Sequence, residues 1–202
     1  MDRFWFLTWH TYGTWLPGDA RGFVTELRDA NWNKYLPNVP GSECQADLPG
    51  LKRFASDALA GEPVWLSAEH ATTLLSQFRE TAQYRKWELF AVAVLVNHAH
   101  LVVGVQGDPE PATILGDFKE YGSRALSRQF GKPPARWWTQ TGSKRKLPNT
   151  GALRGAIAYT RDQDRPLLVW LNESAIRATF PATEAASLIS PEREDQQGER
   201  HA

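Results

Sequence analysis

Cysteine is almost absent from this sequence of 202 residues, which holds Cys44 and no other. A single cysteine cannot form an intrachain disulfide, and it excludes any Cys-x-x-Cys metal site. Long apolar runs are missing too, since none approaches the roughly 20 residues that span a bilayer. The opening segment MDRFWFLTWH lacks the charged, apolar and small-residue zones of a signal peptide. We therefore expect a cytoplasmic protein.

Net charge is also lacking, because 23 Lys and Arg residues balance 23 Asp and Glu residues. The positive and negative residues are, however, unevenly distributed along the chain. Residues 119–166 carry 11 basic against 3 acidic residues, whereas residues 1–118 carry 9 against 14. A basic segment can attract an anion even in a protein of zero net charge. A solvated helix face followed by a loop would give the same distribution.

Hydrophobic residues make up 42% of the chain, which is enough for the core of one domain. We expect that domain to cover 1–180. Within it, 14–66 is rich in proline and glycine without any sustained periodicity, and it predicts an irregular insertion. The last stretch, 181–202, has few large apolar residues and predicts a disordered tail.

The periodicity of the remaining segments predicts a succession of strands and helices. The expected elements are a strand at 4–13, a helix at 67–84, strands at 87–96 and 99–106, a helix at 111–129, a strand at 135–140 and a helix at 151–163. The first six follow the order βαββαβ. This order indicates an α+β, ferredoxin-like antiparallel sheet with helices on one face, plus a late helix. Segment 166–174 fits a strand or a helix.

Two histidines interrupt the apolar run VLVNHAHLVVGV at 94–105. Alternate residues of a strand point the same way, so His98 and His100 share one face of the sheet. Two imidazoles spaced in this way can converge on one divalent metal ion. Two hydrogen-bonded structural histidines would give the same pattern.

A third metal ligand and a nucleophile can be sought on the late helix. Tyr159 and Gln163 in AIAYTRDQDRP are spaced i and i+4, which places them on one helix face. The amide oxygen of Gln163 is an acceptable ligand for Mg²⁺ or Mn²⁺. A tyrosine that only packs against the helix is the alternative for Tyr159. Tyr121 is the other candidate nucleophile, but it shares the apolar side of its helix.

The motif VNHAHLVV on a strand, followed by IAYTRDQ on a later helix, resembles the HUH single-strand transposases. Within that group the chain looks most like the REP-associated tyrosine transposases and their insertion-sequence relatives. The likeness covers 4–13 and 67–165. It implies that His98, His100 and Gln163 bind Mg²⁺ or Mn²⁺ and that Tyr159 is the nucleophile.

The resemblance implies a metal-dependent single-stranded DNA endonuclease and strand transferase that forms a 5′-phosphotyrosine intermediate. Its expected partner is single-stranded DNA with a hairpin, and the enzyme acts as a monomer or a homodimer. Two other functions fit the same residues. One is a non-catalytic ferredoxin-like module that binds single-stranded nucleic acid, and the other is an H-x-H metal hydrolase that uses activated water.

The basic segment supplies candidate DNA contacts, because cations can follow the phosphates of a single strand while an aromatic ring stacks on a base. The candidates are Arg124, Arg128, Arg136, Trp138, Lys144, Arg145, Lys146, Arg154 and Arg161.

Overall fold

The computed structural model describes residues 1–19, 27–28, 34–35 and 48–190. Its strands are β1 (Arg3–His10), β2 (Leu27–Arg28), β3 (Lys34–Tyr35), β4 (Glu88–Val94), β5 (His98–Val105), β6 (Ser143–Leu147) and β7 (Leu168–Leu171). Its helices are α1 (Pro49–Asp57), α2 (Ala68–Arg85), α3 (Pro111–Phe130), α4 (Thr150–Arg161), α5 (Glu173–Thr179) and α6 (Ala182–Ile189). None of the helices in this part of the chain is both long and apolar enough to cross a membrane.

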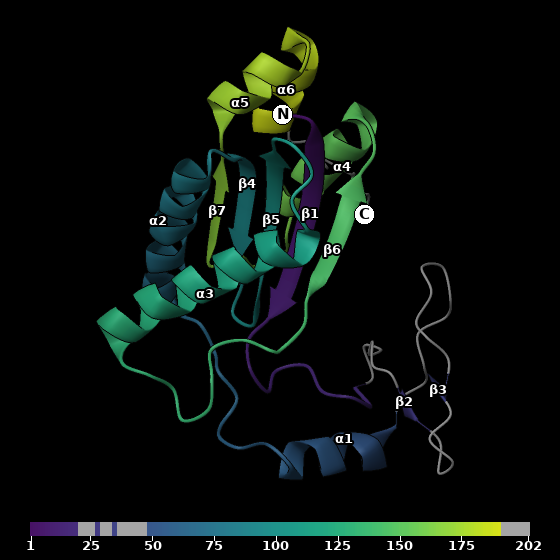
Figure 1. Cartoon of the computed structure of the whole chain (residues 1–202), viewed down its shortest axis with the longest axis vertical. Coiled ribbons are helices and arrows are strands. Elements are labelled where there is room, and N and C mark those ends of the chain that lie inside the picture. The colour runs from purple at the N-terminus through teal and green to yellow at the C-terminus, as the bar shows by residue number, and fades with distance from the viewer. Residues whose placement is uncertain (20–26, 29–33, 36–47, 191–202) are drawn as a thin grey trace, which may run out of the picture.

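The main sheet has five strands in the order β6-β1-β5-β4-β7, and every neighbouring pair is antiparallel. Its first four strands are arranged as in a ferredoxin-like fold, which confirms the predicted class. Helices α2 and α3 lie together on one face, and α4 packs on the other (Figure 1). The strand β7 extends the sheet beyond β4, so 166–174 forms a strand and then begins a helix.

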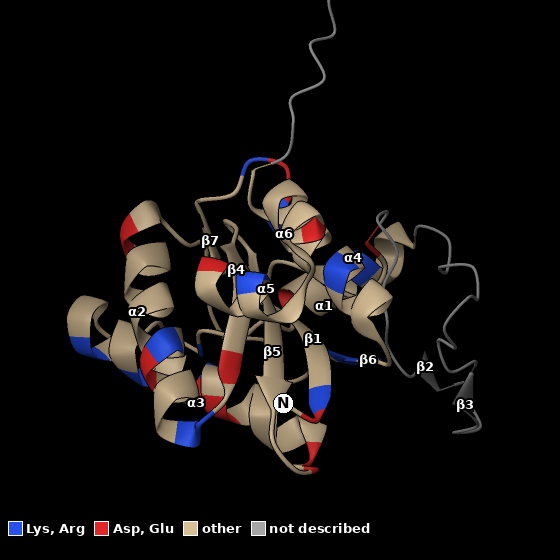
Figure 2. Cartoon of the chain, turned by 90° about the horizontal axis from the view of Figure 1, so that it is seen from above, with Lys and Arg blue, Asp and Glu red and all other residues tan. Residues whose placement is uncertain are grey.

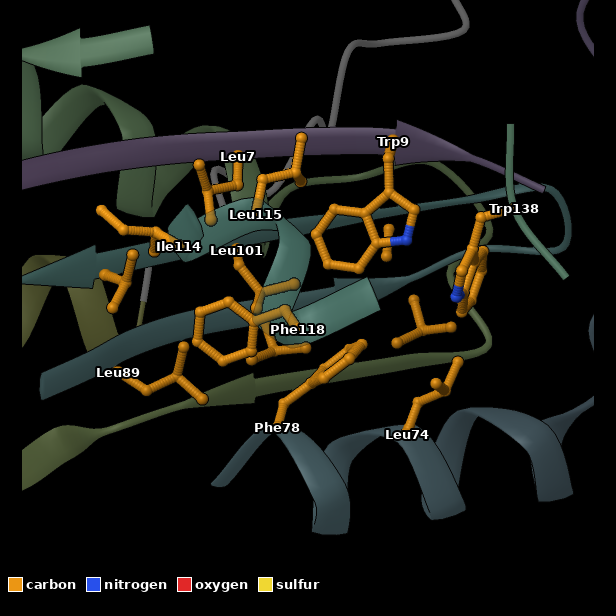
Figure 3. Packing of buried hydrophobic residues seen from close by; sticks show 14 of the residues in the cluster. Leu7, Trp9, Leu74, Phe78, Leu89, Leu101, Ile114, Leu115, Phe118 and Trp138 are labelled. Atoms are coloured by element: carbon orange, nitrogen blue, oxygen red, sulfur yellow. The ribbon is translucent and has the colours of Figure 1, made fainter. Parts of the chain in front are cut away.

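The face under α2 and α3 is a continuous apolar core. Trp5, Leu7 and Trp9 alternate along β1 and point into it. Helix α2 begins at a capping box in which Ser67 and the third residue of the helix, His70, bond each other's backbone amides. Figure 3 shows Trp9 and Trp138 beside Phe78 and Leu74 of α2. Burial of this cluster holds both helices against the sheet.

A second apolar cluster lies on the opposite face, where α4, α5 and α6 pack against β4 and β5. It includes Phe90, Val102, Leu153 and Ile157. Because both faces are covered, β4 and β5 are apolar almost throughout, which explains why they read as unbroken hydrophobic runs. The two histidines of β5 lie at the open end of this second face.

The prediction of a strand at 135–140 is wrong. This segment makes one isolated bridge, between Thr11 and Trp138, and the edge strand is instead β6, for which the sequence predicted no strand. The reason is that Trp137 and Trp138 are adjacent and both buried. Strand geometry sends neighbouring side chains to opposite faces, so a segment that buries both must leave the regular strand conformation.

The two segments expected to be irregular are partly ordered. The 14–66 insertion contains α1 and the short pair β2–β3, while 20–26, 29–33 and 36–47 lie outside the described residues. The disordered tail expected from 181 is wrong for α6, in which Ala185 and Leu188 are buried. The rest of that tail, 191–202, lies outside the described residues. Two small apolar residues at helical spacing were enough to add a helix to the second core.

Replacement of Leu188 tests whether α6 belongs to the domain. Leu188→Ala should lower the free energy of unfolding by about 2–4 kcal/mol, because it removes a buried side chain from the second cluster. The neighbouring Ser187 is exposed, so Ser187→Ala should change it by less than about 0.5 kcal/mol. Urea denaturation measures both. Equal stabilities of the two variants would mean that α6 does not pack on the sheet.

Candidate functional site

The pairing of β1 with β5 builds the floor of the candidate site. In this register His10 lies opposite His98 and Thr8 opposite His100. These four residues share the α4 face of the sheet, because the intervening Trp9 and Ala99 belong to the core on the other face. Four polar side chains are thereby gathered at one end of the second face.

His100 is the most buried member of this group, with 4% of its surface exposed. Its Nδ1 is hydrogen bonded to the hydroxyl of Thr8 at 2.7 Å, whereas its buried Nε2 has no hydrogen-bond partner among the described residues. Burial, together with the nearby His98 and His10, lowers the pKa of His100 to about 3, against a smaller opposing effect of a hydrogen bond with Gln163. The ring is therefore neutral at physiological pH.

His98 is held by its neighbour in the chain. Nδ1 of His98 lies 2.7 Å from the side-chain oxygen of Asn97. Because a carbonyl oxygen only accepts, Nδ1 carries the proton and Nε2 carries the lone pair that can bind a metal. The ring centre of His98 lies 4.7 Å from that of His100 and 5.4 Å from that of His10.

Helix α4 brings a tyrosine to the histidines. The side chain of Asn149 caps the helix by accepting from the amide of Ala152. Tyr159, on the last turn, stacks edge-on against Phe6 and His100, with ring centres 5.7 and 5.4 Å away. It is 55% exposed. Its ring is thus fixed by the sheet while the residue stays open to solvent.

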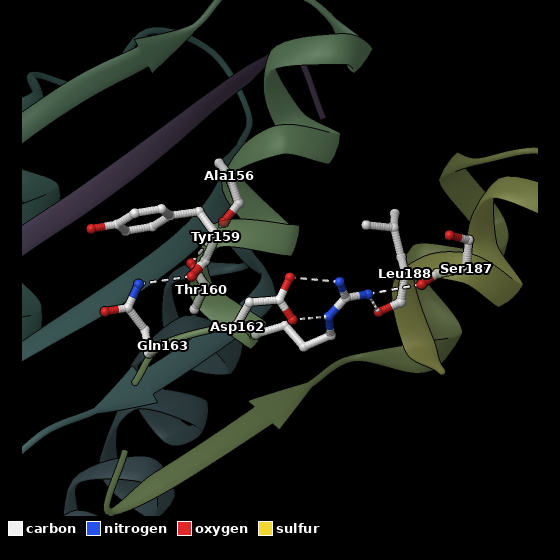
Figure 4. Close-up of polar contacts among 8 residues, drawn as sticks. Ala156, Tyr159, Thr160, Asp162, Gln163, Ser187 and Leu188 are labelled. Atoms are coloured by element: carbon white, nitrogen blue, oxygen red, sulfur yellow. Dashed lines mark hydrogen bonds and ion pairs between the residues drawn. The ribbon is translucent and has the colours of Figure 1, made fainter. Parts of the chain in front are cut away.

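Gln163 lies just beyond the end of α4, which stops at Arg161 rather than at 163 as expected. Its side-chain amide donates to the backbone oxygen of Tyr159 at 2.8 Å (Figure 4). That bond turns the side chain back along the helix and leaves its own carbonyl oxygen available as an acceptor or ligand. The structure therefore brings together the four residues that the sequence singled out, although their chemical roles stay predictions.

The described residues contain no group of three or more His, Cys, Asp or Glu side chains arranged to hold a metal ion. A ligand set at this site would accordingly need an oxygen from another residue type, and Gln163 is placed to supply it. The two histidine ring nitrogens described above suit such a set, since each belongs to an imidazole that is oriented by a hydrogen bond at its other nitrogen.

Sequence reasoning missed Thr8 and His10, which lie beside the predicted pair. The sequence did contain a sign of them, because the segment LTWH places Thr8 and His10 at alternate positions of the first strand, on the same face. This alternation does not point to a site until the partner strand and its register are known. The antiparallel pairing with β5 places Thr8 and His10 beside His100 and His98.

The candidate DNA contacts do not form one surface. Figure 2 shows basic residues on α3, on one side of the sheet, and on α4, on the other. The basic side chains of the edge strand β6 are likewise divided between the two faces of the sheet. Arg145 lies opposite Phe6 and shares the α4 face with the buried Leu147, whereas Lys144 and Lys146 alternate toward the face of α3. Arg124, Arg128 and Arg136 lie on the α3 side or in the loop after it.

Several of these candidates already have partners inside the protein. Trp138 is buried and donates its indole N–H to the backbone of Lys119, so the expectation that it stacks on a base is not supported. Arg161 donates to the backbone oxygens of Ser187 and Leu188 and is paired with Asp162. These contacts make Arg161 a structural link between α4 and α6.

The remaining pairs are exposed and weaker. Arg154 forms an ion pair with Glu184 at 3.6 Å, and Arg124 is paired with Glu120 one turn away. Pairs of this kind contribute about 0–1 kcal/mol each, so phosphates could displace them at little cost.

Comparison with known proteins gives structural matches. No protein-family model and no curated protein sequence matches this chain. One solved structure, of a REP-associated tyrosine transposase bound to a REP hairpin, aligns with 89% of this chain and 83% of its own, at 13% sequence identity and a TM-score of 0.46. The function of the site is therefore argued below from its own side chains.

The lowered pKa of His100 predicts a pH-dependent stability. Below pH 6.5 the unfolded chain takes up a proton at this residue that the folded protein does not bind until about pH 3. The free energy of unfolding should therefore fall as the pH falls through this window, by at most about 1.4 kcal/mol per pH unit. Histidine ¹⁵N resonances, recorded with a chelator present, should show His100 still neutral at pH 5. Protonation of His100 near pH 6.5 would contradict its burial.

Proposed function

We propose that the chain is a metal-dependent single-stranded DNA endonuclease and strand transferase that acts through a phosphotyrosine on Tyr159. One observation carries the proposal. The exposed Tyr159 lies edge-on against a buried, neutral histidine whose Nε2 has no partner among the described residues. A structural histidine in a core normally satisfies both ring nitrogens, so an unsatisfied one beside an exposed phenol favours a ligand-binding role over the purely structural alternative.

The proposed metal site consists of His98, His100 and Gln163, and these residues fit Mg²⁺ or Mn²⁺. The buried Nε2 of His100 is the observation behind this assignment, because it meets no hydrogen-bond partner among the described residues and carries a lone pair when Nδ1 donates to the Thr8 hydroxyl. A metal bound there would polarise the scissile phosphate and offset the charge that develops on it.

The chain's own residues would orient and carry out the exchange. Phe6 and His100 hold the ring of Tyr159 edge-on, which aims the phenol rather than leaving it to rotate freely. The Tyr159 oxygen attacks the phosphorus, a bond forms between them, and the bond to the 3′ oxygen breaks. The phenol proton passes, in net terms, to the departing 3′ oxygen. One ester replaces another, so a 3′-hydroxyl can reverse the reaction without ATP.

The proposed site is complete within one chain, since His98, His100, Tyr159 and Gln163 all come from the same copy. Dimerisation is therefore not required for a single cleavage. The proposed substrate is single-stranded DNA, because a single flexible strand can bring its phosphate to a tyrosine that stands on the sheet surface.

Removal of the nucleophile tests the proposal. Tyr159→Phe should keep DNA binding and lose covalent adduct formation completely, because only the attacking oxygen is removed. Tyr84→Phe is the matched control, since Tyr84 is also exposed but stands on α2. The assay incubates labelled single strands drawn from hairpins flanking the gene with Mn²⁺ and resolves protein–DNA adducts on a denaturing gel.

The alternatives give different results in the same assay. Free cleaved DNA without an adduct, unaffected by Tyr159→Phe, would indicate the metal hydrolase that uses water. Binding without cleavage in any variant, including His98→Ala, would indicate the non-catalytic module. An adduct that survives Tyr159→Phe would place the nucleophile elsewhere.

Strand alternation in β6 makes a second prediction about the proposed reaction. Arg145 shares the face of Tyr159, so Arg145→Gln should lower the cleavage rate at saturating DNA by about tenfold or more, through loss of a cation near the phosphate. Lys146 points to the other face, and Lys146→Gln should affect affinity rather than this rate. Single-turnover cleavage measures both. Equal losses of cleavage rate in the Arg145→Gln and Lys146→Gln variants would contradict a specific role for the face of β6 that Arg145 shares with Tyr159.

A further inference from the structure

A cleft of about 480 Å³ opens on the α3 side of the molecule, across the sheet from Tyr159. One wall is α3, and the other is the irregular segment that leads into β6. The lining residues are Ala112, Leu115, Gly116, Lys119, Glu120, Ser123, Arg136, Trp137, Trp138, Thr139, Gln140, Thr141, Gly142 and Lys144. Its volume falls in the range of sites that take small ligands.

Three cations from separate segments line this cleft, namely Lys119, Arg136 and Lys144. None of them forms an ion pair within the described ranges, and the carboxylate that lines the cleft, Glu120, is paired with Arg124 instead. Burial, together with the charges of Lys144 and Arg136, lowers the pKa of Lys119 to about 8. The cations repel one another, and an anion placed among them would relieve that repulsion.

Lys119 also fixes the wall of the cleft. Its ammonium group donates to three successive backbone oxygens, those of Thr139, Gln140 and Thr141, at 2.7, 3.0 and 3.2 Å. The indole N–H groups of the two tryptophans are likewise bonded, to Ser127 and to the backbone of Lys119. The cleft is therefore built by the protein's own hydrogen bonds before any ligand arrives, which reduces the cost of ordering on binding.

Gly116 is the independent sign that the cleft takes a ligand. It stands inside α3, where glycine is less favourable than alanine by roughly 0.5–1 kcal/mol. Packing does not require a glycine there, because a Cβ atom added to Gly116 would meet no atom within 4 Å. The missing side chain leaves helix backbone bare in the cleft, beside the apolar Leu115. A flat group can lie against such a surface.

We propose that this cleft binds one unpaired nucleotide of the DNA strand, with its phosphate between Arg136 and Lys144 and its base against Gly116 and Leu115. Lys119 adds positive charge without a direct hydrogen bond, because its three N–H groups are already donated to the backbone. The choice of DNA rests on the proposed function. The cleft offers an apolar surface and a cationic rim, which together match a base joined to a phosphate better than either part alone. Contact here, on the face opposite Tyr159, would anchor the strand away from the point of cleavage.

Filling the cleft is the direct test. Gly116→Leu should weaken binding of an oligothymidine of about eight nucleotides by about tenfold, as expected when one base contact is lost. Leucine also improves helix propensity at this position, so the variant should fold, and its thermal unfolding checks this. Thr113→Leu is the matched control, because it adds the same side chain to an exposed position of α3 outside the cleft.

A spectroscopic readout locates the bound nucleotide independently of affinity. The indole N–H resonances of Trp137 and Trp138, assigned from their phenylalanine variants, should shift on addition of dTMP and of the oligonucleotide. They should shift much less with thymidine or with inorganic phosphate alone. Lys144→Gln should weaken binding and reduce its salt dependence by about one phosphate contact, whereas Lys132→Gln, outside the cleft, should not.

The measurements use the Tyr159→Phe background, so they do not depend on cleavage. Oligonucleotide binding without an indole shift, or equal affinities of the Gly116→Leu and Thr113→Leu variants, would overturn the cleft assignment. Phosphate that binds as tightly as dTMP would overturn the nucleotide as its ligand. An adduct on Tyr159 of the unmodified protein, with no binding in the cleft, would leave the proposed function intact and overturn the cleft assignment. Binding in the cleft with no adduct in the unmodified protein would support the cleft assignment and overturn the proposed function.

Discussion

The antiparallel pairing of β1 with β5 is the constraint on which the rest of the site depends. It sets Thr8 opposite His100 and His10 opposite His98, on one face, while Trp9 and Ala99 turn into the core. A slip of one residue would move every side chain to the other face, which would bury the histidines among the tryptophans. The apolar core under α2 and α3 thus determines indirectly where the polar group lies.

The second requirement is that α4 be held firmly above that polar group. Arg161 adds to the packing of the buried Leu153 and Ile157, because it donates to two backbone oxygens of α6 and is paired with Asp162, whose pKa its hydrogen bond lowers. The exposed pair of Arg154 with Glu184 links the same two helices. A segment that looked like a tail therefore supports the helix that presents Tyr159, which is a reason for it to be ordered.

The sheet also separates two surfaces that differ in character. The α4 face carries a buried neutral imidazole, an exposed phenol and an amide oxygen, a combination suited to chemistry on a bound phosphate. The α3 face carries a cleft with three cations and a bare stretch of helix, a combination suited to binding. In the proposed function a single strand would contact both faces by passing around the exposed edge strand β6, whose side chains alternate between them.

The sequence by itself determined the ferredoxin-like order of elements, because periodicity depends on local geometry. It also determined the pairs His98–His100 and Tyr159–Gln163, since the members of each pair are close in the chain, whereas the family resemblance joined the two pairs into one site. Only the tertiary structure decided the position of the edge strand, the order in α6 and the presence of Thr8 and His10 at the site. The edge strand and the placement of Thr8 and His10 depend on contacts between residues about 90 or more positions apart along the chain. Helix α6 depends on contacts with Arg161, 26 and 27 positions away. Such contacts leave no periodic pattern in either partner alone.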